Sequence, residues 1–202
     1  VYMLSGNAGE IFAVSLVAIL DAPLPLLPLQ ILYINIVSDV FPALALGVGR
    51  GGATMDEPPR APDEPILTRR HWAVIGGFGL VIGGAALAVF AYALLVAGFD
   101  EAEAVTLSFA TFTLGRLWHT LNMRDARTTA GDDPVLTNPF VWAAIGLGVL
   151  LLLAALYVPP IALALDTVAP SPLGWALIAG GSLVPLVVGQ LALLILGRRR
   201  RG

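Results

Sequence analysis

The chain has 202 residues, of which 57% are hydrophobic and only 12% are charged. A typical soluble domain has about 25% charged residues, so this chain lacks the polar side chains needed to cover its apolar surface in water. A lipid bilayer is therefore its expected surroundings. The net charge of -3 gives no basis for a nucleic-acid partner, and the absence of cysteine excludes disulfides and thiolate metal sites.

Charge-poor apolar runs, separated by proline, glycine and polar residues, predict six membrane-spanning helices. The expected spans cover residues 1–20, 29–48, 72–99, 104–123, 140–158 and 173–197, with polar loops at 49–71 and 124–139. The predicted fold class is an all-α membrane protein, a six-transmembrane-helix bundle that occupies residues 1–202 as one domain. The chain begins with Val1 inside an apolar run, so we expect it to be a piece of a longer protein.

The arginines support this topology. Six spans place ten of the 11 arginines on one side of the membrane, after the second, fourth and sixth spans. The opposite side carries Asp21, Asp100, Glu101, Glu103 and Asp166, with no arginine or lysine. Cytoplasmic loops are enriched in Lys and Arg, so the arginine side and both chain termini are expected in the cytoplasm.

Polar side chains inside the spans are concentrated in the first, second and fourth spans. The first span has Asn7 and Glu10, and the second has Asn35, Ser38 and Asp39, each set on one helix face. These groups offer only oxygen ligands, which suit hard cations such as Ca²⁺. The alternative is a polar contact between two helices, with a protonated Glu10.

Helix-breaking residues lie next to both sets. Gly6 and Gly9 flank the polar residues of the first span, and Pro42 follows Asp39 by three positions. Proline in a helix frees the carbonyl four residues earlier, here that of Ser38. Unwound backbone inside a membrane is tolerated where it lines an ion site, although an ordinary proline kink would explain Pro42 as well.

Several segments resemble P-type ATPases, and most closely the calcium pumps of the sarco/endoplasmic reticulum and bacterial type. Residues 5–10 (SGNAGE) and 28–47 (PLQILYINIVSDVFPALALG) are similar to the fifth and sixth membrane helices of that family. Residues 55–67 resemble its loop between helices six and seven, and Leu121-Asn122 resembles the end of its eighth helix. The resemblance implies that the chain is the C-terminal half of the membrane domain, helices five to ten.

The resemblance also implies roles for the polar residues. Asn7 and Glu10 would be cation ligands on helix five, and Asn35, Ser38 and Asp39 would be ligands on helix six. Glu10, Asn35 and Asp39 would be the principal metal ligands. ATP and Mg²⁺ would bind to cytoplasmic domains that this sequence lacks, and the first four membrane helices of the parent pump would complete the transport domain alongside the lipid bilayer.

Arg116 is the one arginine inside a span. Aligned on Leu121-Asn122, it stands where two-site calcium pumps have a glutamate ligand on helix eight. A guanidinium is always charged and has no acceptor, so it repels cations. We expect it to pair with Glu10 and act as a built-in positive charge, leaving one cation site at Asn35 and Asp39. The alternatives are that Arg116 snorkels toward the cytoplasm or that the alignment is out of register.

The sequence departs from complete pumps in one respect that limits its activity. The phosphorylation motif Asp-Lys-Thr-Gly-Thr is absent, and the chain has no lysine. We therefore expect no catalytic residue here and neither ATP hydrolysis nor transport by this chain alone. The expected function is the cation-binding half of an ATP-driven pump that exports Ca²⁺ across a bacterial plasma membrane. The alternatives are a self-contained six-helix secondary transporter or channel, or a P-type pump for Mn²⁺, Na⁺ or another cation.

Overall fold

The computed structural model describes residues 1–48, 65–124 and 133–199, and every regular element within these ranges is a helix. The predicted loop motif at residues 55–67 lies mostly outside the described ranges, as do Arg50, Arg60, Arg127, Arg200 and Arg201. The elements are α1 (Tyr2–Ile19), α2 (Pro28–Ile34), the π-helical segment η1 (Asn35–Val40), α3 (Phe41–Gly47), α4 (Arg69–Leu95), α5 (Glu101–His119), the 3₁₀ segment η3 (Thr120–Met123), α6 (Pro139–Tyr157), α7 (Pro159–Leu165) and α8 (Pro172–Arg199).

Polar residues at the helix starts satisfy backbone N–H groups that have no partner within the helix. The hydroxyl of Thr68 accepts from the N–H of His71 at the start of α4 (3.4 Å), and a carboxylate oxygen of Asp100 accepts from Glu103 at the start of α5 (2.8 Å). At the start of α6, the side-chain oxygen of Asn138 accepts from the N–H of Phe140 (2.9 Å). The side-chain nitrogen of Asn138 donates to the Ala45 carbonyl in α3 (2.9 Å). Sequence-local capping thus fixes where these helices begin.

The fold is an all-α membrane bundle, as predicted. Within the described residues, five stretches are long and apolar enough to cross a bilayer: α1, α2 through α3, α4, α6 and α8. The exception is α5, which has Glu101, Glu103 and Arg116 as well as several hydroxyl side chains. Its position in the bundle explains this composition, because nearly all its residues from Ala104 to His119 are buried. The sixth span therefore remains a prediction that rests on the place of α5 in the bundle.

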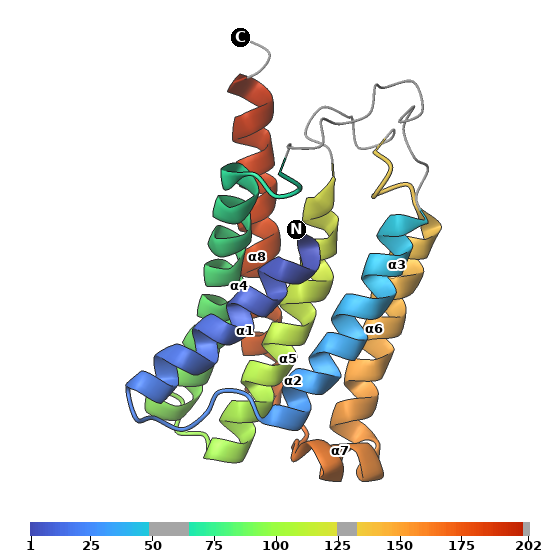
Figure 1. Ribbon diagram of the computed structural model, residues 1–202. Helices are drawn as coiled ribbons and strands as arrows, with labels where there is room; N and C mark the ends of the chain where they lie inside the picture. The colour runs from blue at the N-terminus through green and yellow to red at the C-terminus, as the bar shows by residue number, and fades with distance from the viewer. Residues whose placement is uncertain (49–64, 125–132, 200–202) are drawn as a thin grey trace.

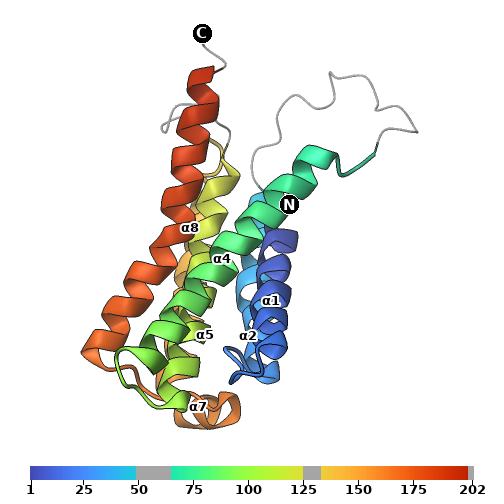
Figure 2. The same cartoon turned by 90° about the vertical axis from the view of Figure 1, so that its left-hand side faces the viewer.

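Helix α5 is the centre of the fold. It packs against α4 and α8 on one side and contacts η1, α2 and α6 on the other (Figures 1 and 2). Helix α1 lies along α4, and α3 lies along α6. The two polar spans therefore pack mainly on different helices, α1 on α4 and α3 on α6, and both reach the buried helix α5.

The helices alternate in direction, so that chain segments of the same kind gather at each end (Figure 1). The start of α4, which carries Arg69 and Arg70, lies at the same end as the segment after α5 with Arg124 and the last residue of α8. The connections that contain Asp21 and Asp100 lie at the opposite end, together with α7. This arrangement follows the charge separation expected from the sequence for those residues that are described.

Residues 159–165 differ from expectation. The sequence predicts that Pro159 and Pro160 begin a loop, whereas the structure has the short helix α7 there. Proline is compatible with the first turn of a helix, because the N–H it lacks has no partner there. Asp166 ends α7 in a left-handed conformation (φ 52°), and the Leu165 carbonyl accepts a hydrogen bond from the Gln30 side chain of α2 (3.0 Å).

Glycines allow α1 and α4 to touch at their backbones. A Cβ on Gly83 would lie 2.6 Å from the carbonyl oxygen of Gly9, and a Cβ on Gly79 would lie 2.9 Å from Cβ of Ala8. The spacing of Gly79 and Gly83 is the GxxxG pattern that permits close helix packing in membranes. This contact fixes α1, and with it Asn7 and Glu10, against the rest of the bundle.

Replacing Gly83 by alanine should therefore push α1 away from α4, because the atom that the new methyl meets is backbone. Overpacking of this kind costs about 1–3 kcal/mol. The adjacent change Gly84→Ala is a matched control, because nothing lies within 4 Å of a Cβ there. Thermal unfolding of the protein in detergent should give a lower midpoint for Gly83→Ala only. Equal midpoints for the two variants would contradict this account of the packing.

Candidate cation site

The guanidinium of Arg116 lies at the meeting point of three helices. One terminal nitrogen, Nη1, is ion-paired with Glu10 Oε1 and donates to Asn35 Oδ1 (3.1 Å). The other, Nη2, is ion-paired with Asp39 Oδ1 and donates to Asn7 Oδ1 (3.1 Å). Arg116 thus binds four oxygens, two from α1 and two from η1.

These charges are buried. Arg116 is 1% exposed, Glu10 is 6% exposed and Asp39 is 5% exposed. A lone charge at this depth would be costly, whereas a guanidinium fork can bind more than one carboxylate at a time. If all three groups are ionised, their sum is one negative charge. The site therefore retains an attraction for one further positive charge even with the arginine in place.

The helix that carries Asn35 and Asp39 continues without a break here but changes from α-helical to π-helical. Residues 35–40 form the π-helical segment η1, and Pro42 follows in the first turn of α3. Proline at 42 leaves the Ser38 carbonyl without its usual N–H donor. The hydroxyl of Tyr2 takes that place, 2.6 Å from the Ser38 carbonyl oxygen. The carbonyl expected from the sequence to be freed by Pro42 thus accepts a hydrogen bond from another helix.

The predicted ligand residues do not all occupy equivalent places. Asn7, Glu10, Asn35 and Asp39 converge on Arg116, but the Ser38 hydroxyl donates to the Ile34 carbonyl of its own helix (2.6 Å). The side chain of Ser38 is therefore turned away from this cluster, although its backbone lies beside it.

The position of Arg116 settles one alternative and changes one expectation. The snorkelling alternative is wrong, because the side chain is buried and bound to carboxylates. The sequence expects Glu10 as its partner and leaves Asn35 and Asp39 for a cation. In the structure the guanidinium contacts those two residues as well. Each of its two terminal nitrogens contacts one residue of α1 and one of η1, so the guanidinium joins both helices.

Tyr2 is a site residue that the sequence analysis missed. Its hydroxyl lies 2.6 Å from the Ser38 carbonyl oxygen and 3.2 Å from that of Arg116, so it joins η1 to α5. The signal was present, because Tyr2, Gly6 and Glu10 recur at four-residue intervals and so share one face of a helix.

His119 lies one turn beyond Arg116 and packs against aromatic rings. Its ring centre is 4.3 Å from that of Phe78 and 5.9 Å from that of Tyr2, and its Nδ1 lies 3.3 Å from Asn122 Nδ2. The ring is 1% exposed. These contacts favour a packing role for this histidine.

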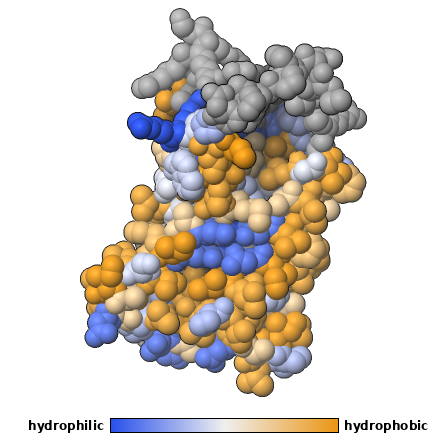
Figure 3. All heavy atoms as spheres, viewed as in Figure 1, coloured by the Kyte–Doolittle hydropathy of each residue, from blue (hydrophilic) through white to orange (hydrophobic). Residues whose placement is uncertain are grey.

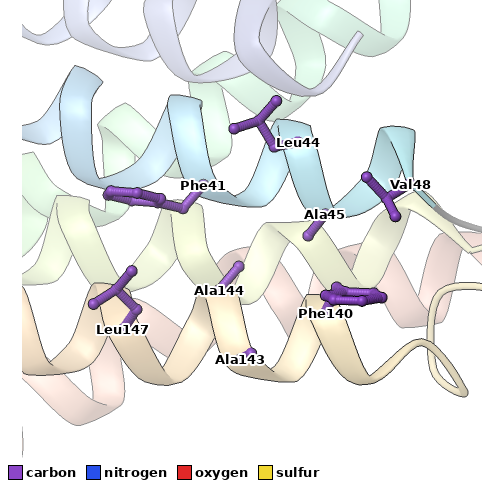
Figure 4. A pocket seen from close by; sticks show the side chains of 8 residues that line it. All are labelled: Phe41, Leu44, Ala45, Val48, Phe140, Ala143, Ala144 and Leu147. Carbon is purple, nitrogen blue, oxygen red and sulfur yellow. The ribbon is translucent and has the colours of Figure 1, made fainter.

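Two grooves differ in chemistry. The first, of about 260 Å³, lies between α3 and α6 and is lined only by apolar side chains, among them Phe41 and Phe140 (Figure 4). The second, of about 550 Å³, is open and reaches Asp39 from the side of Met3 and Val40. Figure 3 shows a hydrophilic patch at mid-height on an otherwise largely apolar face of the molecule. The second groove therefore opens beside Asp39, whereas the side chains that line the first groove offer no oxygen ligand.

Comparison with known proteins agrees with this architecture. Residues 23–195 match the family model described as "Cation transporting ATPase, C-terminus". The chain belongs to this family. It is also 35% identical over 194 residues to the calcium-transporting ATPase of Bacillus subtilis (strain 168), and 28% identical over 206 residues to calcium-transporting ATPase 1 of Bacillus cereus (strain ATCC 10987 / NRS 248).

The alignments cover 94% of this chain in both cases, but only 22% and 23% of the respective relatives. The chain thus corresponds to less than a quarter of the length of these cation-transporting ATPases. The P-type resemblance inferred from residues 5–10 and 28–47 is confirmed, and the chain is an integral membrane protein of this family.

The burial of Arg116 gives a test of the site that does not depend on transport. The double variant Glu10→Gln/Asp39→Asn keeps the shapes but leaves the guanidinium without a counter-charge. Removing the partners of a buried charge costs about 3–5 kcal/mol, so we expect the unfolding midpoint of the full-length protein in detergent to fall. Adding Arg116→Met to the double variant should raise the unfolding midpoint again and recover much of the lost stability.

The control is Asp21→Asn/Glu101→Gln, which removes two exposed carboxylates and changes the total charge equally. It should leave the midpoint nearly unchanged. If the double and triple site variants were equally unstable, the guanidinium would not be the reason for the loss.

Proposed function

We propose that this chain is the membrane-embedded cation-binding half of an ATP-driven P-type pump that exports Ca²⁺ from the cytoplasm through a single cation site. The observation that carries the proposal is the convergence of four oxygen-bearing side chains, from α1 and η1, on the buried guanidinium of Arg116. Four side-chain oxygens that bind the fixed positive charge of Arg116 are also suited to bind a transported cation.

The donor set favours calcium. Carboxylate and amide oxygens are the ligands of hard cations, and Ca²⁺ takes six to eight of them. Both reported relatives are named calcium-transporting ATPases. The described residues contain no group of three or more His, Cys, Asp or Glu side chains placed to hold a metal. The four oxygens therefore form an incomplete shell, to which other parts of the pump would contribute.

Charge balance supports one cation rather than two. With Glu10, Asp39 and Arg116 ionised, the site carries one negative charge, so one Ca²⁺ leaves a single positive charge in a medium of low dielectric constant. A second Ca²⁺ would leave three, at the high cost of unpaired buried charge. The guanidinium also occupies oxygens of both carboxylates, so the transported ion must compete with Arg116 for Asp39 and Asn35.

The exposed polar patch supports the proposal that other membrane helices complete the site. Asn7 and Asn35 are only half-buried, and Asp39 lines an open groove whose other lining residues are largely apolar. In the parent pump the first four membrane helices would cover this face, and the cytoplasmic domains would bind ATP and Mg²⁺. With α5 as the sixth span, the arginine end would face the cytoplasm of a bacterium.

The alternative of a self-contained transporter has less support. Such folds place their site between internal repeats, whereas here the charged cluster uses α1, η1 and α5 and has no counterpart among α4, α6 and α8. Mn²⁺ and Na⁺ remain alternative cargoes, and a transport assay on the full-length pump with a panel of cations distinguishes them.

Asp39→Asn should abolish calcium-dependent phosphorylation of the full-length pump, because it removes the only carboxylate of the π-helical segment η1. The fold should persist, since Arg116 keeps its ion pair with Glu10. Phosphoenzyme formed from labelled ATP, measured across a range of Ca²⁺ concentrations, gives the result. Exposed Asp21→Asn is the matched control. Calcium dependence like that of the unaltered pump would remove Asp39 from the site.

The single-site proposal predicts one Ca²⁺ bound per phosphorylatable pump. Equilibrium binding of radioactive calcium to the purified full-length protein, divided by the maximal phosphoenzyme, measures this ratio. The charge on Arg116 is the reason for the low number. A ratio of two would refute the single site and with it the role of Arg116 as a built-in charge.

A further inference from the structure

Gly6 lies where the Arg116 side chain crosses α1. A Cβ built on Gly6 would overlap Arg116 at Nε, Cζ and Nη2, and these are its three nearest atoms. Gly6 is buried and lies one residue before Asn7 and four before Glu10, so the guanidinium passes directly over its backbone on the way to both ligand residues.

The glycines at the contact between α1 and α4 have a different reason to be glycine. At Gly9 the nearest atom to an added methyl is the Gly79 carbonyl oxygen, 2.9 Å away, so backbone packing excludes a side chain. At Gly6 the nearest atoms belong to the far end of a flexible side chain. The three atoms nearest to an added methyl at Gly6 thus all belong to the guanidinium, and none of them is backbone.

We propose that Gly6 is a specificity-determining residue, whose missing side chain lets Arg116 reach the oxygens of both helices and so compete with the transported cation. This inference rests on the proposed function. It differs from the sequence-based account of Gly6, which treats the residue only as a helix breaker beside the ligands. In the structure, the guanidinium of Arg116 packs directly against this glycine.

The backbone of Arg116 has little freedom to compensate for a methyl group at position 6. Its carbonyl oxygen lies 3.2 Å from the Tyr2 hydroxyl, and the surrounding turns of α5 are buried against α4 and α8. The side chain must therefore move. A displaced guanidinium cannot keep all four of its contacts, so it releases oxygens that a transported cation uses.

The experiment is a double-mutant cycle in the full-length pump, with Gly6→Ala, Arg116→Ala and the two combined. The measurement is the Ca²⁺ concentration that gives half-maximal phosphorylation from ATP. Gly6→Ala and Arg116→Ala should each lower it by about tenfold, the equivalent of one charge-assisted hydrogen bond. In the Arg116→Ala background, Gly6→Ala should change it by less than about twofold, because the atoms it meets are gone.

Gly77→Ala is the matched control for alanine in a membrane helix, since Gly77 is exposed with nothing within 4 Å of a Cβ. It should leave the calcium dependence unchanged. If Gly6→Ala fails to fold, folding of the combined variant still supports the inference, because Arg116 is then the obstacle. Failure of both to fold would overturn it, since a packing defect does not depend on Arg116.

The failures of the two proposals are distinguishable. If Arg116→Ala leaves the calcium dependence unchanged, the competition of Arg116 with the cation fails, and the single-site function loses its basis. If Arg116→Ala shifts the dependence but Gly6→Ala does not, or if Gly6→Ala has the same effect with and without Arg116, only the role of Gly6 fails.

Discussion

The buried guanidinium of Arg116 is the constraint on which the rest of this structure depends. A charge in the middle of a membrane domain is stable only if carboxylates meet it at the same depth. That requirement brings Glu10 of α1 and Asp39 of η1 to the same guanidinium of α5. It also constrains two nearby residues. Gly6 leaves space for the Arg116 side chain, and the Tyr2 hydroxyl binds the backbone carbonyls of Ser38 and Arg116.

The π-helical segment η1 and the ion pairs form one unit. A regular helix from Pro28 to Gly47 would have directed its carbonyls along its own axis. The π-helical turn and Pro42 instead leave the Ser38 carbonyl free to accept from Tyr2, which joins η1 to the α1 and α5 helices. Such π-helical turns are frequent at functional sites. Here the irregular backbone is stabilised by a partner from another helix, as buried polar groups in lipid require.

Charge and hydropathy were sufficient to predict the all-α membrane bundle and the converging residues Asn7, Glu10, Asn35 and Asp39, because polar groups inside apolar spans have few places to go. Sequence could not predict that Arg116 would bind residues of both helices, since the reach of a long side chain depends on the distance between helices. It also missed Tyr2, whose hydroxyl matters only once Ser38 has lost its helical donor. Helix α7 was missed because two prolines indicate a break and equally a helix start.

The low hydropathy of α5 and its central position have the same origin. A helix with a buried arginine and several hydroxyls cannot face lipid, so it is surrounded by α4, α6, α8 and η1, and its charge is thereby placed within reach of both polar spans. The net negative charge that remains limits what can complete the site. Under the proposed function, a divalent cation would leave one positive charge on the described residues and would demand one further carboxylate from outside them for neutrality, whereas a monovalent cation would demand none.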